Sequence, residues 1–123
     1  MPNPVVHFEI TGKDAEGLQQ YYRDLFGWSL TPMAPDVPYG LVSPEETGGG
    51  IGGGVGASMD GASLLTVYVQ VDDIKGALDR AVELGGEVVQ PPTVIPGTVT
   101  YAQFRDIEGH LVGLAASETP PAE

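Results

Sequence analysis

The sequence repeats itself with a shift of 59 residues. The run Val6–Ile10 and the helix-like segment after it lie over Leu65–Val69 and a second such segment, so that Gly27 falls on Gly86. A unit of this size is too small to bury a hydrophobic core alone, and two copies are therefore expected to pack together. The seam between them is a natural place for a small molecule.

The chain length sets the outer limits. At 123 residues, we expect one domain, residues 1–123, made of a first module over about 4–58, a second over about 63–117 and a short frayed C-terminal tail. The longest apolar runs fall far short of the roughly 18 residues that span a bilayer. The start Met-Pro-Asn-Pro also lacks the features of a signal peptide. The sequence predicts a cytoplasmic protein with no membrane partner.

Composition excludes several kinds of chemistry. The chain contains no cysteine, so disulfides, thiolate nucleophiles and iron–sulfur clusters are ruled out. The net charge of −12, with five Lys and Arg residues in all, argues against a nucleic-acid partner, which needs a basic surface. The acidic balance is explained by solubility or by attraction of a cationic ligand, and both interpretations stay open.

Apolar periodicity predicts the order strand, helix and three strands in each half. The stretch Thr11–Asp14 is expected to turn the chain and to offer capping oxygens to the first helix, which stops at Gly27. The second helix is expected to begin after Asp72 or Asp73. The predicted strands are residues 5–10, 28–30, 39–42, 48–56, 65–71, 87–89, 98–105 and 111–115. The predicted inward helical residues are Ala15, Leu18, Tyr22, Leu25, Ile74, Ala77, Leu78, Ala81 and Leu84. The fold class is therefore α+β, made of two βαβββ modules.

Three segments carry a resemblance to a known family: Tyr21–Trp28 at the end of the first helix, Val69–Ile74, and Phe104–Leu114, which is the most specific. Together with the paired βαβββ plan they resemble the vicinal oxygen chelate superfamily, the group of glyoxalase I, bleomycin resistance proteins and extradiol dioxygenases. The resemblance implies strands curled around a cleft and assembly as a homodimer. In the enzymes of this group it also implies a divalent metal, held by residues of the first and last strand of each module.

The metal positions that the resemblance implies are mostly lost in this sequence. The first-strand positions are His7, which is a competent ligand, and Thr66, whose neutral hydroxyl is a poor one. The last-strand positions fall at Gly113 and in Gly50–Gly54, which have no side-chain donor. Because a family-type site needs about three protein donors, we expect no cofactor. A divalent metal held through His7 is the alternative.

Polar residues share one face of the two first strands. His7 and Glu9 are two residues apart and point to the same side, and Thr66, Tyr68 and Gln70 occupy the corresponding face of the second module. A His and a Glu on one wall can act as acid and base, or can orient a bound ligand. The alternative is that they hydrogen-bond to one another inside a packed interior.

The glycine run and the aromatic residues complete the candidate site. Gly48–Gly53 satisfies a dinucleotide spacing, but no helix follows it, so we reject a nucleotide site. The run is either a flexible hairpin or a surface that something bulky approaches closely. The aromatic candidates to line the cleft are Trp28, Tyr39, Tyr68, Tyr101 and Phe104. His110 is expected to be exposed in the last hairpin.

These observations favour a metal-independent protein that sequesters or carries a small molecule in the inter-module cleft. The residues expected to bind the ligand are Trp28, Tyr39, Thr66, Tyr68, Gln70 and Tyr101. One alternative is a lyase, isomerase or dioxygenase that uses His7 and Glu9, with or without a metal. Another is an interaction subunit whose cleft is filled by its own dimer partner.

Overall fold

The structure is a computed structural model that describes residues 2–58, 60–96 and 99–117. The chain divides into two compact units: one is Val6–Thr66, and the other runs from Val67 onward and includes the residues before Val6. Within the described ranges, no helix is long and apolar enough to cross a membrane. Residue 98, the first residue of the strand predicted at 98–105, and the predicted C-terminal tail lie outside the described residues.

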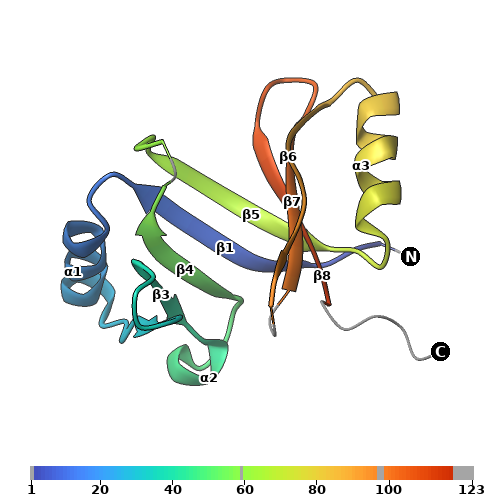
Figure 1. Ribbon diagram of the computed structural model, residues 1–123. Coiled ribbons are helices and arrows are strands. Elements are labelled where there is room, and N and C mark those ends of the chain that lie inside the picture. The colour runs from blue at the N-terminus through green and yellow to red at the C-terminus, as the bar shows by residue number, and fades with distance from the viewer. Residues whose placement is uncertain (1, 59, 97–98, 118–123) are drawn as a thin grey trace. The chain divides into compact units, whose positions relative to one another are not determined.

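Among its described residues, the first unit contains four strands, two helices and the start of β5 (Leu64–Gln70) (Figure 1). Its elements are β1 (Val5–Gly12), α1 (Ala15–Phe26), β2 (Thr31–Pro32), β3 (Tyr39–Val42), α2 (Pro44–Thr47) and β4 (Gly52–Ala57). The strands lie in the order β2-β3-β4-β1, with β4 antiparallel to β3 and parallel to β1.

The second unit repeats this arrangement. Its elements are β5 (Leu64–Gln70) from Val67 onward, α3 (Ile74–Glu83), β6 (Glu87–Ile95), β7 (Val99–Arg105) and β8 (Leu111–Ser117). The strand order is β5-β8-β7-β6, and β8 is parallel to β5 and antiparallel to β7. The predicted α+β class with a βαβββ order in each half is confirmed. The first unit adds the one-turn helix α2.

The helix caps preserve the repeat in atomic detail. The side chain of Asp14 accepts a hydrogen bond from the backbone N–H of Gly17 at 3.0 Å, and Asp73 accepts one from Gly76 at 3.1 Å. Each pair opens a helix in the same way, with the carboxylate satisfying one of the N–H groups that the first turn leaves unpaired. Of the two predicted caps of α3, Asp73 is therefore the one used.

Each unit has its own small core. Buried Leu30, Val42 and Val55 form that of the first unit, and buried Ile74, Leu78, Ala102 and Leu114 form that of the second. The prediction that Leu25 and Leu84 point inward is wrong, because both are exposed and Leu84 is 62 % accessible. Periodicity identifies the apolar face of a helix but not how much of that face the strands cover.

The strand predicted at residues 28–30 is wrong. Leu30 has a left-handed φ of 53° and is only 1 % exposed, and a left-handed residue interrupts an extended strand. The strand that follows is the two-residue β2 instead. Left-handed backbone costs about 1–2 kcal/mol for a residue with a Cβ, and burial of the leucine side chain offsets that cost.

The strand predicted at 48–56 begins later than expected. Ser43 caps the short helix α2, and Gly48 ends it with a φ of 87°. Gly50 is also left-handed, with a φ of 78°, so extended structure starts only at Gly52. By contrast, β6 extends well beyond the predicted residues 87–89, because two irregularities in its pairing with β7 accommodate Pro91 and its neighbours.

Candidate functional site

Alternation along β1 separates a polar face from an apolar one. Phe8 and Ile10 pack against the core of the first unit together with residues of α1. His7 and Glu9 therefore project from the opposite face of the strand, where both are half-buried. The prediction that these two side chains share a face is confirmed.

Tyr39 of β3 joins the two side chains. Its hydroxyl lies 3.0 Å from Nε2 of His7 and donates a hydrogen bond to Oε2 of Glu9 at 2.9 Å. A tyrosine hydroxyl has one hydrogen, and here it goes to Glu9, so the Nε2–H of His7 is the donor to the tyrosine oxygen. We call this group the His7–Tyr39–Glu9 cluster.

Glycines in β4 make room for this arrangement. Gly54 pairs with Glu9 on one side and with Leu41 on the other. A Cβ at Gly54 would fall on the Tyr39 ring, and a Cβ at Gly53 would fall on the Phe8 ring, in both cases closer than the 3.0 Å that real Cβ contacts respect. The bulky groups that approach the glycine run are therefore the chain's own aromatic rings.

Burial controls the charge state of His7. Removal of the ring from water lowers the pKa of His7 below its ordinary value of 6.5, and the nearby Glu9 carboxylate opposes part of that shift. The imidazole is consequently neutral at neutral pH. This agrees with a ring that donates from Nε2 to Tyr39.

The titration of His7 provides a direct prediction. In the unfolded chain His7 takes up a proton as the pH falls through about 6.5, whereas the folded protein resists until a lower pH. The folded state therefore loses stability relative to the unfolded state as the pH falls below about 6.5, because His7 takes up its proton more readily in the unfolded chain. We expect the NMR titration of the His7 ring to have its midpoint below 6.5, and Glu9→Gln to lower the midpoint further. A midpoint above 6.5, or an upward shift in Glu9→Gln, would contradict the burial argument.

A second polar group lies in the other unit. The amide Nε2 of Gln103 donates to the hydroxyl of buried Tyr68 at 2.8 Å, and the ring of Tyr101 stands edge-on to Tyr68 with centroids 6.5 Å apart. Tyr68 pairs in register with Gly113, where a Cβ would fall on the Tyr68 ring. Gly54 and Gly113 are 59 residues apart, so each unit has a tyrosine ring over the equivalent glycine.

The remaining predicted residues are placed individually. Thr66 is buried at 2 % exposure, while Gln70 is exposed and its backbone N–H donates to the carbonyl of Pro4 at 2.9 Å. Trp28 is half-buried in an aromatic group and stacks on Tyr22 with centroids 5.6 Å apart.

His110 is exposed in the last hairpin, as predicted. Its Nδ1 pairs with Oδ2 of Asp106 at 3.1 Å, rather than with its neighbour Glu108. Two backbone N–H groups of the same turn, those of His110 and Glu108, hold the pKa of Asp106 below its usual range. The pair stabilises a turn and lies outside the polar groups described above.

Two residues of interest were not predicted. Gln103 lies two residues after Tyr101 along β7, so the two side chains point to the same side of the strand. The alternation of the predicted strand contained this signal. Glu46, whose Oε2 accepts a hydrogen bond from the backbone N–H of Ser29 at 2.7 Å, had no such signal. It lies in α2, within a proline- and glycine-rich stretch that predicts a connection.

The residues present do not fit a metal of the family type. Among the described residues, no three His, Asp or Glu side chains come together in a group that could hold a metal ion. At the last-strand positions, tyrosine rings cover Gly54 and Gly113 where a ligand side chain would stand. Nε2 of His7 faces the Tyr39 hydroxyl.

Comparison with known proteins identifies the family. Residues 5–114 match the family described as the Glyoxalase/Bleomycin resistance protein/Dioxygenase superfamily. The match spans most of the chain, and the protein therefore belongs to this superfamily. The resemblance found in the sequence is confirmed. No curated protein matches the chain.

Solved structures agree on the fold. A superfamily member from Vibrio splendidus 12B01 has a TM-score of 0.61 at 16 % identity and covers 94 % of this chain and 100 % of its own. Methylmalonyl-CoA epimerase from Streptomyces coelicolor, in complex with 2-nitronate-propionyl-CoA, has a TM-score of 0.66 at 13 % identity and covers 100 % of both chains. A protein from Legionella pneumophila described as an NAD-dependent benzaldehyde dehydrogenase has a TM-score of 0.65 at 15 % identity and covers 95 % of this chain and 100 % of its own. At these identities the likeness concerns the fold alone.

Proposed function

We propose that this protein binds a small molecule without a metal ion, and that the His7–Tyr39–Glu9 cluster forms part of the binding surface. The observation that carries the proposal is the Tyr39 hydroxyl, which holds an imidazole and a carboxylate in one hydrogen-bonded group. The three side chains are half-buried. Preorganised polar groups of this kind orient a ligand at little entropic cost.

The chemistry of the cluster favours a ligand that donates hydrogen bonds or carries positive charge. The Glu9 carboxylate is an acceptor only, and the chain as a whole has a net charge of −12. Four further residues remain proposed ligand contacts: Thr66, at the end of the first unit, and Tyr68, Gln70 and Tyr101 of the second unit. Methylmalonyl-CoA epimerases of this fold are described in complex with CoA esters, so the fold is compatible with a small organic ligand. We also retain a cytoplasmic homodimer as part of the proposal.

A second candidate function follows from the same hydrogen bonds. A neutral imidazole linked through a hydroxyl to a carboxylate is an arrangement that can transfer a proton, with His7 and Glu9 as acid and base. The protein would then be a metal-independent lyase or isomerase. The two functions differ in their response to Glu9→Gln: a binding protein loses affinity, whereas an enzyme loses turnover while a bound ligand is retained.

Metal binding is the first test of the proposal. We expect calorimetric titration with zinc, nickel, manganese and iron(II) to show no stoichiometric binding that depends on His7, with His7→Ala as the control. Elemental analysis of the purified protein checks the same point. Stoichiometric binding that is lost in His7→Ala would overturn the metal-independent function and point to a metal site built on His7.

A ligand screen weighted toward aromatic and cationic compounds is the second step. For a compound that binds, we expect Tyr39→Phe to weaken affinity by about fivefold to tenfold, because loss of a hydrogen bond within such a group costs about 1 kcal/mol. Tyr21→Phe is the matched control, since Tyr21 is exposed on α1. Equal affinities for the two variants would exclude the cluster from the site.

A further inference from the structure

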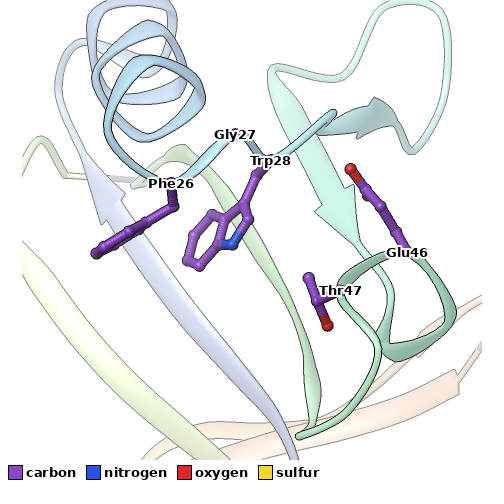
Figure 2. A pocket seen from close by; sticks show the side chains of 5 residues that line it. All are labelled: Phe26, Gly27, Trp28, Glu46 and Thr47. Carbon is purple, nitrogen blue, oxygen red and sulfur yellow. The ribbon is translucent and has the colours of Figure 1, made fainter.

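A pocket of about 500 Å³ lies in the first unit, between the C-terminal end of α1 and the short helix α2. It is lined by Phe26, Gly27, Trp28, Glu46 and Thr47 (Figure 2). In this view the Trp28 ring lies between Phe26 on one side and Glu46 and Thr47 on the other. The pocket therefore has an aromatic wall opposite a wall that carries a carboxylate.

The aromatic wall is held rigidly. Trp28 stacks on Tyr22 at a centroid distance of 5.6 Å, and its ring is 5.2 Å from that of Phe26 at an angle of 40°. Phe8 supports it from the core side, with centroids 5.6 Å apart. Phe26 itself is 58 % exposed. An exposed aromatic surface fixed by its neighbours offers π faces to a ligand without loss of side-chain entropy.

The carboxylate on the other wall is also fixed in place. Oε2 of Glu46 accepts a hydrogen bond from the backbone N–H of Ser29 at 2.7 Å, which ties α2 to the loop that contains Trp28. None of the ion pairs among the described residues involves Glu46. Arg23, the cation nearest to this loop along the chain, donates to the Ser29 carbonyl and to Gln19.

We propose that this pocket binds a small organic cation of the quaternary ammonium type. A positive group without N–H donors is attracted by aromatic faces, most strongly by that of tryptophan, and the opposing carboxylate adds Coulomb attraction. An ammonium that carries N–H groups is more strongly hydrated and gains less from such walls. This site is built from residues separate from the His7–Tyr39–Glu9 cluster, and its test is independent of that proposal.

The test uses Trp28 as its own reporter, because it is the one tryptophan of the chain. The full-length protein is titrated with choline and with its neutral isostere 3,3-dimethylbutan-1-ol at constant ionic strength. Trp28 fluorescence and the indole N–H signal in NMR spectra are recorded. We expect saturable binding of choline at millimolar concentration and affinity at least about threefold lower for the isostere, the difference that a cation–π contact provides.

Two variants test whether the charge of Glu46 contributes to choline binding. Glu46→Gln keeps an acceptor oxygen for Ser29 and is expected to weaken choline binding by about threefold to tenfold. Glu45→Gln removes the same charge from the neighbouring position, which does not line the pocket, and should bind as the wild type does. No saturable change in either signal, equal binding of the isostere, or equal effects of the two variants would each overturn the proposal. Neither Glu46 nor Glu45 belongs to the His7–Tyr39–Glu9 cluster, so failure here is distinguishable from failure of the proposed function.

Discussion

Gly54→Ala should destabilise the protein by about 1–3 kcal/mol, the usual cost of forcing extra volume into a packed position. The new methyl group would fall on the Tyr39 ring, which would have to move. On backbone entropy alone the same substitution would stabilise a strand, so the sign of the effect depends on the ring. Movement of Tyr39 would also disrupt its hydrogen bonds to His7 and Glu9.

Urea unfolding measures this effect, and two controls isolate its cause. Gly49→Ala has open space at its Cβ and no left-handed φ, so its stability should stay within about 0.5 kcal/mol of the wild type. In a Tyr39→Ala background the cost of Gly54→Ala should largely disappear, because the clashing ring is absent. A cost that persists in that background would show that the glycine is needed for some other reason.

Leu78→Ala should lower the free energy of unfolding by about 2–5 kcal/mol. Leu78 is 4 % exposed on α3 and packs with Ile74, Ala102 and Leu114, so truncation removes buried methyl groups and leaves a cavity. This is a large part of the stability of a domain of this size. Because Ala102 and Leu114 belong to β7 and β8, the substitution should weaken the packing of α3 against these two strands.

Leu84→Ala is the matched control for Leu78. Both are leucines that the helical period places on one face, but Leu84 is 62 % exposed. Its replacement should change stability by less than about 0.5 kcal/mol. Similar midpoints for the two variants in urea unfolding would mean that the apolar face of α3 extends to Leu84.

The repeat of 59 residues made the fold predictable. Under this shift β1 corresponds in sequence to β5, α1 to α3, and the capping residue Asp14 to Asp73. Caps, apolar periods and alternation act over a few residues, and each of these local signals supports the same fold in both halves. The shared face of His7 and Glu9 was predictable for the same reason.

The sequence-based predictions were wrong or incomplete where local conformational preferences conflict with burial, or where an element is too short to show an apolar period. Leu30 is in a left-handed conformation that its side chain disfavours, and its burial at 1 % exposure outweighs that preference. Helix α2 is one turn long and begins with a proline, so no apolar period could identify it. With α2 unpredicted, Glu46 and the pocket beside Trp28 could not be predicted either.

The sequence by itself determined the class of fold, the superfamily and the residue types at the family's metal positions, because these depend on short-range patterns. The tertiary structure decided what those residues do. Tyr39 reaches Glu9 across 30 positions of sequence, and the ring lies over Gly54 only because β3 and β4 pair in one register. A contact of this kind depends on strand register and side-chain packing, which no local pattern specifies.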